Sequence, residues 1–363
     1  IKRYQADRSA GPLQATFDPK APGVTRIHLI PLRTGLRKRN PSIVLINGWH
    51  MFRVGPSWAD LLRSFIVTLY ERSEPGRVLS EDELDGILAS VVARMQELYP
   101  SVDTETLLDD LNEIVALCIA VAHGAELPPE IQEEVSWQEL GRDMKAPYRM
   151  DLLVSPMIEA GEWACPLHCK GCYATRQPAM VIDKPLSTGE WKSIIDICRA
   201  AGIPQLTFTG GEPTLREDLV ELIEHAQWHV TRLNTNGLNL SLDYAKRLFD
   251  ANLDAVQVTL YSGEAAIHDE LVGRKGAFPK TVESIGNALK AGLSVSVNTP
   301  LVQLNSKYAE TLSFIAGLGV KYVTCSGLIA AGAGQDQIKA GAALDNAGLM
   351  ESLRAAVQAA QAL

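Results

Sequence analysis

The sequence predicts an α/β protein in which a small winged-helix-like α+β domain precedes a partial (β/α)6 TIM barrel. Two observations predict this fold. From Tyr148 onward, strand-like and helix-like segments alternate six times, and such alternation implies a parallel sheet covered by helices. Before that point, strands come first and three helices follow, which is the order of a separate unit. We expect an N-terminal arm over 1–23, the α+β domain over 24–125, a linker over 126–147 and the barrel over 148–363.

Composition limits the kinds of partner. The chain has 363 residues, of which 46% are hydrophobic and 21% charged, and its formal net charge is −9. This is an ordinary globular composition, and the negative charge argues against nucleic acid as a partner. We find no apolar run of about 18 residues, so we expect no membrane span, and no signal peptide is visible at Ile1. Six cysteines, three clustered and three scattered, suit thiols in a reducing cytoplasm better than disulfides.

The first domain contains a hairpin signal. Residues 1–23 are rich in Pro, Gly and Ala and show no periodicity, so we expect a loosely held arm. A strand is expected over Arg26–Ile30. Asn47-Gly48 separates the apolar runs 42–46 and 49–54, and this predicts a hairpin because both turn residues must take positive φ.

Three helices are expected after this hairpin. Ser57 would cap the first, Ser80 with Glu83 forms a capping box for the second, and Asp103 starts the third. Cys118 falls on the apolar face of the third helix, so we interpret it as a buried core thiol.

The alternating segments of the barrel place each strand and helix. Strands are expected near 150–157, 204–209, 230–235, 254–260, 293–299 and 320–325. Helices are expected near 187–201, 216–227, 241–251, 279–291, 306–317 and 346–362. Catalytic residues in such barrels gather at the C-terminal ends of the strands, so the loops that follow the strands should form the site.

The loop after the first barrel strand carries three cysteines, Cys165, Cys169 and Cys172, at the spacing C-x3-C-x2-C. Thiolates bind iron–sulfur clusters and zinc. A cubane cluster has four irons, so three thiolates leave one iron free to bind a small molecule. Zinc would need a fourth ligand, but the chain has no second C-x2-C pair, and His168 is constrained by the ligands on both sides. The spacing favours a cluster, with structural zinc and unligated thiols as the alternatives.

The loop after the second strand reads Thr-Gly-Gly-Glu-Pro (209–213). C-x3-C-x2-C followed by G-G-E-P resembles the radical S-adenosylmethionine (SAM) enzymes, and the resemblance extends over about 148–362. It implies a [4Fe–4S] cluster on Cys165, Cys169 and Cys172. It also implies that SAM binds the free iron and is cleaved by one electron to a 5′-deoxyadenosyl radical, which takes a hydrogen atom from the substrate. A flavodoxin or ferredoxin would supply the electron.

The resemblance further assigns cofactor contacts to six residues: Gly210, Gly211, Glu212, Thr259, Arg274 and Asn298. The G-G-E segment would form the strand edge that holds the methionyl amine, Thr259 would contact the ribose, and Arg274 would pair with the methionyl carboxylate. Arg274 belongs to an H-D…R-x-G-x-F pattern that begins at His268 and resembles the branch with the SPASM-type peptide maturases. Asn298 matches a polar cofactor contact on the fifth strand, and Leu328 would face the adenine through its backbone.

Several positions depart from the family pattern. Gly171 stands where the family has an aromatic residue before the last cysteine, and Tyr173 either supplies the missing ring or lies in the core. Tyr261 stands where the family often has an acid. Relatives in this branch carry a cysteine-rich C-terminal region for auxiliary clusters, which is not present in these residues. Cys325 is either a lone auxiliary ligand or, as we favour, a buried strand thiol, and we interpret Cys198 as core packing.

The end of the hairpin reads V-x-x-S-W-A-x-L-L (54–62), and together with the element order it resembles the peptide recognition element found beside many radical SAM peptide-modifying enzymes. This resemblance implies that a leader peptide adds a strand to the sheet edge. Basic residues near that edge would attract an acidic leader or form only a solvated loop: Arg33, Arg37, Lys38 and Arg39. The alternative is a structural domain that binds no peptide.

Three functions follow from these resemblances. The first is a radical SAM enzyme that modifies a ribosomally synthesised precursor peptide by a thioether or carbon–carbon crosslink or by epimerisation. The second is a radical SAM enzyme of cofactor biosynthesis that acts on a small molecule, such as a precursor of haem or molybdopterin. The third is a zinc-stapled binding protein without activity, although zinc does not explain the segment Gly210–Pro213. The sequence identifies neither the substrate nor a general acid or base.

Overall fold

The computed structural model describes residues 12–17, 25–32, 41–48, 50–73, 78–129, 131, 144, 146–159, 161–175, 181–182 and 184–362. The chain divides into two units: Ile1–Met150 with Ser193–Leu206 and Ala226–Val230, and Asp151–Lys192 with Thr207–His225 and Thr231–Leu363. The basic residues within 33–39 lie outside the described residues, as does most of the expected linker over 126–147.

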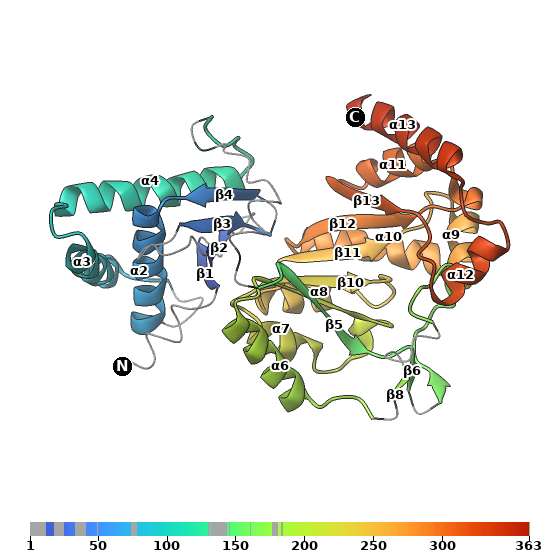
Figure 1. The fold of residues 1–363 in the computed structure, drawn as a ribbon, viewed down its shortest axis with the longest axis horizontal. Coiled ribbons are helices and arrows are strands. Elements are labelled where there is room, and N and C mark those ends of the chain that lie inside the picture. Colours follow the sequence, from blue (N-terminus) through green and yellow to red (C-terminus); the bar gives the residue numbers. More distant parts are fainter. Residues whose placement is uncertain are drawn as a thin grey trace. The chain divides into compact units, whose positions relative to one another are not determined.

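The first unit contains an antiparallel sheet in the order β1-β2-β3-β4 (Figure 1). Its strands are β1 Leu13–Phe17, β2 Thr25–Pro31, β3 Ser42–Ile46 and β4 His50–Val54. The expectation of a loose arm is wrong for residues 13–17, because all five pair with β2. The sequence of β1 alternates apolar Leu13, Ala15 and Phe17 with polar Gln14 and Thr16, a period-two pattern too short to stand out among the neighbouring Pro, Gly and Ala residues.

The predicted hairpin and helices are present. Asn47 and Gly48 take φ values of 50° and 74° between β3 and β4. The helices that follow are α2 Pro56–Arg72, α3 Glu81–Leu98 and α4 Thr104–Ala122. Cys118 is fully buried in the core between α4 and the sheet, which confirms its structural role.

Two of the three predicted caps are confirmed. Ser80 and Glu83 form the capping box of α3, and the Asp103 side chain accepts a hydrogen bond from the backbone N–H of Thr106 at the start of α4. Ser57 is not a cap. Helix α2 instead begins at Pro56, with Gly55 as its N-cap, because proline has no N–H to leave unsatisfied in the first turn.

The second sheet has six strands in the order β13-β12-β11-β10-β9-β5, so each strand neighbours the next one in the chain. The strands are β5 Arg149–Ser155, β9 Gln205–Gly210, β10 Val230–Thr235, β11 Ala255–Thr259, β12 Ser294–Pro300 and β13 Tyr322–Ser326. The strands from β10 to β13 pair in parallel, which confirms the predicted partial barrel.

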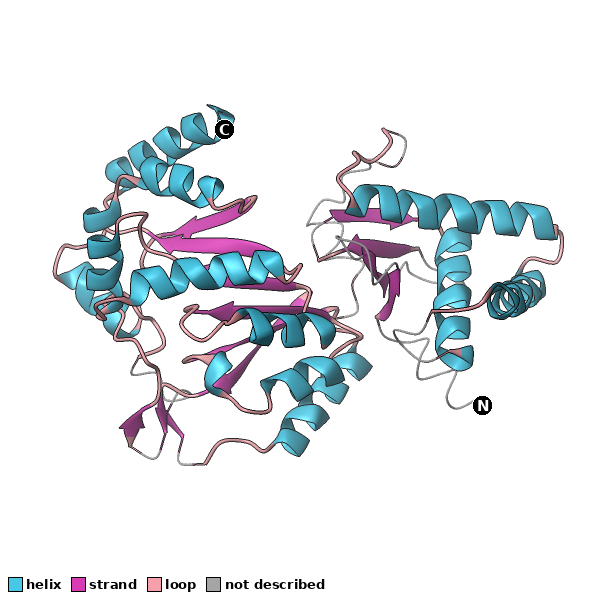
Figure 2. Ribbon diagram, turned by 180° about the vertical axis from the view of Figure 1, so that it is seen from behind, coloured by secondary structure: helices cyan, strands magenta, loops and turns pink. Residues whose placement is uncertain are grey.

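Helices cover the outer face of this sheet (Figure 2). They are α6 Thr188–Ala201, α7 Leu219–His225, α8 Leu242–Asp250, α10 Ala277–Lys290, α11 Tyr308–Gly317 and α13 Asn346–Ala362. The chain adds α9 Ala265–Val272 before α10, α12 Gly332–Lys339 after β13, and the short 3-10 helices Pro213–Leu215 and Gln303–Asn305. A small sheet of β6 Ile158–Glu159, β7 Glu162–Trp163 and β8 Val181–Ile182 lies between β5 and α6 in the chain.

Alternation along the barrel strands makes their inner face polar. On β11, Val256 and Val258 are fully buried, whereas Gln257 and Thr259 line a cavity on the other side of the sheet. A closed barrel fills its interior with branched apolar side chains. Here the interior offers amides and hydroxyls, so it is suited to hold a polar ligand.

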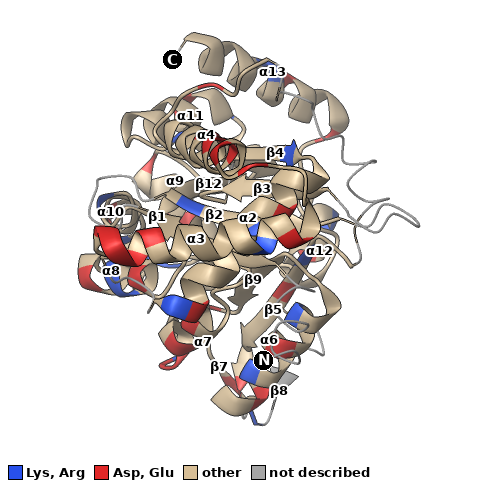
Figure 3. Ribbon diagram, turned by 90° about the vertical axis from the view of Figure 1, so that its left-hand side faces the viewer, with Lys and Arg blue, Asp and Glu red and all other residues tan. Residues whose placement is uncertain are grey.

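Charged residues lie largely on the helices, where Lys and Arg are interspersed with Asp and Glu (Figure 3). None of the described helices combines the length and the apolar composition needed to cross a membrane.

Candidate active site

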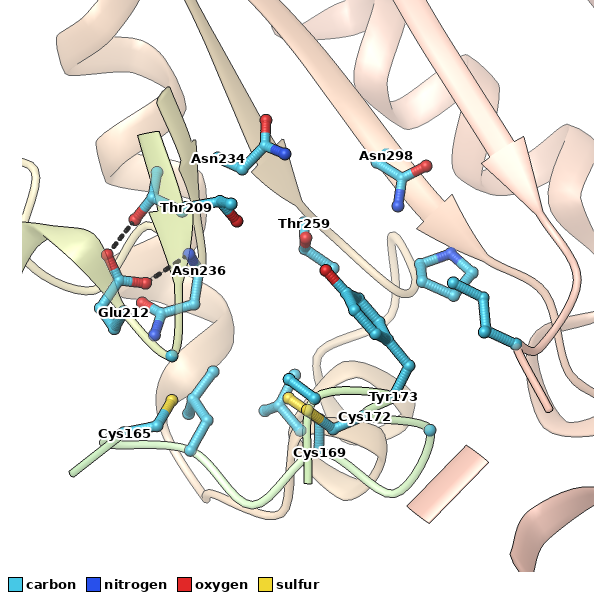
Figure 4. A pocket seen from close by; sticks show the side chains of 18 of the residues that line it. Cys165, Cys169, Cys172, Tyr173, Thr209, Glu212, Asn234, Asn236, Thr259 and Asn298 are labelled. Carbon is cyan, nitrogen blue, oxygen red and sulfur yellow. Dashed lines mark hydrogen bonds between the residues drawn. The ribbon is translucent and has the colours of Figure 1, made fainter. Parts of the chain in front are cut away.

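A cavity of about 220 Å³ lies at the C-terminal ends of the barrel strands. The three motif cysteines line it together with polar residues from the strands and the loops that follow them: Thr209, Glu212, Asn234, Thr235, Asn236, Gln257, Thr259 and Asn298 (Figure 4). The cavity therefore brings together the loops after the first three strands, as the barrel rule requires.

The cysteine loop is fixed by the end of α9. The backbone N–H groups of His168 and Lys170 donate to the carbonyls of Val272 and Leu271 at 3.0 Å and 2.9 Å. Gly273 takes a φ of 68°, and a Cβ there would lie 2.7 Å from the His168 carbonyl oxygen. The helix end thus satisfies its terminal carbonyls with the loop, and the glycine allows the close approach.

The three thiols are poised for metal binding and not for catalysis as free groups. None of the three forms a disulfide with another described cysteine. Burial raises the pKa of Cys165 to about 11, and burial also raises the pKa of Cys169 and Cys172. Buried thiols of this kind become thiolates only when a cation compensates their charge.

The donor set fits a cluster better than one zinc ion. Within the described ranges, no three His, Cys, Asp or Glu side chains converge as the ligands of a single metal ion do. In a [4Fe–4S] cluster each thiolate binds a different iron, so the cysteines stand further apart than around zinc. His168 is no fourth ligand, because it does not line the cavity and its ring stacks on Trp163 with 4.9 Å between centroids.

The two glycines after β9 serve the packing of the sheet as well as the cavity. Gly210 takes a φ of +136°, and a Cβ on Gly210 would lie 2.2 Å from the Ser155 carbonyl oxygen. A Cβ on Gly211 would lie 2.2 Å from the Pro156 carbonyl oxygen, and its N–H donates to Ser155 at 2.9 Å. Only glycine lets the end of β9 lie this close to the end of β5.

Glu212 is 1% exposed, and its carboxylate accepts four hydrogen bonds. Thr214 donates its N–H at 3.0 Å and its hydroxyl at 2.6 Å. The Thr235 hydroxyl donates at 2.7 Å and the Asn236 N–H at 2.8 Å, and Figure 4 marks two hydrogen bonds that reach this carboxylate. Burial raises the pKa of Glu212, and these donors act against it. The carboxylate expected to meet a methionyl amine thus ties the loops after β9 and β10 together.

Thr259 and Asn298 both line the cavity and are paired in register on β11 and β12. The Thr324 hydroxyl donates to Asn298 Oδ1 at 2.9 Å, which leaves the Asn298 amide nitrogen to face a ligand.

Arg274 lies apart from these residues. It does not line the cavity, it is exposed, and it donates to the Pro166 carbonyl at 3.1 Å. Its pattern neighbours are also structural. His268 Nδ1 accepts from the Tyr261 N–H, and Asp269 accepts from Gly276 and Phe278 N–H groups. Arg274 thus holds the cysteine loop in this structure, and its pairing with a methionyl carboxylate stays a prediction.

The departures from the family pattern also have structural explanations. A Cβ at Gly171 would lie 2.7 Å from Leu328 Cδ2, so a larger residue would displace Leu328 from the cavity wall. Tyr173 is not core, because it is 49% exposed at the cavity. Cys198 is buried, as expected. Cys325 packs beside Tyr308 and does not line the cavity, but it is only partly buried, so the expectation of a buried strand thiol is wrong for Cys325.

Several lining residues have no role predicted from the sequence, namely Thr209, Asn234, Asn236, Gln257 and Tyr261. Most of these residues could have been found from polar side chains two positions apart near the end of a strand. Asn234 and Asn236 are one such pair, and Gln257 and Thr259 are another.

Comparison with known proteins agrees with this site. Residues 164–315 match the model of the Radical SAM superfamily. The Fe-coproporphyrin III synthase of Methanosarcina barkeri is 34% identical over 143 residues, which are 39% of this chain and 35% of that protein. The PqqA peptide cyclase of Methylocella silvestris is 30% identical over 164 residues, 44% of this chain and 43% of that protein. The chain thus spans less than half the length of these relatives.

Among solved structures, Streptococcus suis SuiB bound to the precursor peptide SuiA is similar with a TM-score of 0.47 and 13% identity, covering 80% of this chain and 60% of that one. The cysteine loop, the glycine turn beside it and the matched segment coincide in one domain. Residues 164–315 therefore form a domain of the radical SAM superfamily, whose members work with a [4Fe–4S] cluster and SAM.

Proposed function

We propose that this enzyme modifies a ribosomally synthesised precursor peptide, by a thioether or carbon–carbon crosslink or by epimerisation. The observation that carries the proposal is the chemistry of the cavity wall. Its described lining contains no Lys or Arg, and its polar groups are amides and hydroxyls besides the already bonded Glu212. A peptide backbone offers neutral donors and acceptors that such groups match.

The rival function, cofactor biosynthesis on a small molecule, is also represented among the relatives, which include a coproporphyrin synthase. Tetrapyrroles carry carboxylates and phosphorylated precursors carry phosphates. Proteins hold such anions with Arg or Lys. The described lining residues provide neither, so they favour the peptide.

The chain's own residues hold the reacting groups. When bound at the three cysteines, the cluster with SAM supplies one electron and a 5′-deoxyadenosyl radical that takes a hydrogen atom from the substrate. Gly210 and Gly211, which have no side chains, would offer backbone groups to the methionyl end of SAM, and Thr259 with Asn298 would face its ribose. A flavodoxin or ferredoxin in a reducing cytoplasm would deliver the electron.

We assign leader binding to the β4 edge of the first unit. In the described sheet β4 pairs with β3 alone, so its outer backbone groups can pair with an added strand. His50, Met51 and Arg53 are only partly buried along this strand.

The test compares the two substrate classes on the same protein. The full chain is reconstituted anaerobically, reduced with dithionite and given SAM with either a precursor peptide encoded beside the gene or the iron tetrapyrrole from which Fe-coproporphyrin III is formed. We expect 5′-deoxyadenosine in step with a change in the peptide, seen by mass spectrometry as hydrogen loss or deuterium uptake from solvent. Conversion of the tetrapyrrole with an unchanged peptide would reject the proposal.

Leader binding has a separate test. The leader segment alone, added in trans, should inhibit modification of the full precursor and leave modification of a leaderless core peptide unaffected. If it has no effect on either, β4 is not a leader site.

A further inference from the structure

The side-chain amide of Asn236 places a buried donor beside the first cysteine of the motif. Its Nδ2 atom is buried and has no hydrogen-bond partner of standard geometry in the described chain. In Figure 4 the Asn236 side chain extends toward Cys165 across one corner of the cavity. A buried donor without an acceptor costs about 1–3 kcal/mol, so this amide needs a partner.

The orientation of Asn236 is fixed by the rest of its hydrogen bonds. Its backbone N–H donates to Glu212 Oε2 at 2.8 Å, and its Oδ1 accepts from the Leu238 N–H at 2.9 Å. With the oxygen engaged by the turn, the amide nitrogen is left to face the cavity. The Glu212 carboxylate also accepts hydrogen bonds from Thr214 and Thr235. This network of hydrogen bonds around a buried carboxylate fixes the position of Asn236 beside the cysteine loop.

We propose that Asn236 Nδ2 donates a hydrogen bond to the Cys165 sulfur in the cluster-loaded enzyme, and that Glu212 holds Asn236 in this orientation. Hydrogen bonds to ligand sulfurs stabilise the more negative, reduced cluster and so raise its reduction potential. Asn236 is thus a positioning residue that tunes the cluster through Cys165. This inference concerns the cluster alone and holds whichever substrate the enzyme uses.

The experiment measures the reduction potential of the reconstituted full chain by EPR-monitored titration, without SAM or peptide. Asn236→Leu removes the donor with little change in volume. We expect about a tenfold fall in the reduction equilibrium constant, which is a potential lower by about 59 mV for one electron. Asn236→Asp keeps the oxygen that accepts from Leu238 but replaces the donor with a second acceptor, so it should lower the potential at least as far.

Asn234→Leu is the matched control. Asn234 lies on β10, two residues before Asn236, and lines the same cavity, but Figure 4 shows it on the side away from Cys165, so its loss should leave the potential unchanged. An unchanged potential in both Asn236 variants, or an equal shift in Asn234→Leu, overturns the proposal. Weaker SAM binding at an unchanged potential also overturns it, since Asn236 would then be a SAM ligand.

Discussion

Two segments that each match a pattern of the radical SAM family have different structural roles in this domain. The glycine–glutamate segment, residues 210–212, lies in the cavity wall. The histidine–arginine segment, residues 268–278, lies behind the cysteine loop, and none of its pattern residues His268, Asp269, Arg274 and Phe278 lines the cavity. A motif therefore marks a position that the site requires, either because the residue meets the cofactor or because it supports the loop that does.

The two segments also differ in how their carboxylates are held. Glu212 is fully buried and receives bonds from two loops. Asp269 is only partly buried, and it accepts from Gly276 and Phe278 within its own turn. The first carboxylate joins separate strands, whereas the second closes a local turn between α9 and α10.

Replacing each carboxylate by alanine should expose this difference most strongly. Glu212→Ala leaves several buried donors without an acceptor and should lower the free energy of unfolding by about 4 kcal/mol or more, while Asp269→Ala should lower it by about 1 kcal/mol. Urea unfolding of the two apoproteins, followed by circular dichroism, measures both losses. Equal losses would contradict the distinction between the segments.

Acid should weaken the histidine–arginine segment next. Burial lowers the pKa of His268 from 6.5 to about 4. Between pH 6.5 and 4 the unfolded chain binds a proton here that the folded chain does not, so stability falls as the pH drops through this window and is unaffected by His268 above it. The loss approaches about 3 kcal/mol near the lower end.

The matched variant for this effect is His268→Asn, whose Oδ1 can replace Nδ1 as the acceptor for the Tyr261 N–H. In this variant the unfolding free energy should depend less on pH, because the contribution of His268 protonation is gone. The contribution of His229 to the pH dependence should remain, since burial lowers the pKa of His229 to about 4 as well. If His268→Asn leaves the pH dependence unaltered, the pKa of His268 is the same in the folded and the unfolded protein, which contradicts the prediction.

The sequence predicted the barrel well because its signal is repeated. Six strand–helix units share one pattern, so an error at one boundary leaves the others intact. The cysteines were also predictable, because metal ligands occur at fixed short spacing. Strand β1 was missed because its alternation covers five residues inside a segment rich in Pro, Gly and Ala.

The roles of individual site residues were harder to predict, because a residue type does not tell where its hydrogen bonds go. Glu212 and Arg274 both looked like partners for the charged ends of SAM. In the structure, the Glu212 carboxylate accepts hydrogen bonds from Thr235 and Asn236. The Arg274 guanidinium donates to the Pro166 carbonyl. Asn236 was overlooked for the opposite reason, since an asparagine in a turn is usually explained by the turn alone.

Arg274 provides the smallest and most discriminating test of the comparison. If it only supports the cysteine loop, Arg274→Ala removes one hydrogen bond to Pro166 and should lower the free energy of unfolding by about 1 kcal/mol. The KM for SAM should then change by less than about twofold, whereas loss of a bidentate partner for the methionyl carboxylate would raise it by about tenfold or more. Lys275→Ala, on the neighbouring exposed side chain, is the control for a change of charge at this turn. A large rise in KM for Arg274→Ala alone would return Arg274 to the cofactor site and would mean that the loop rearranges when SAM binds.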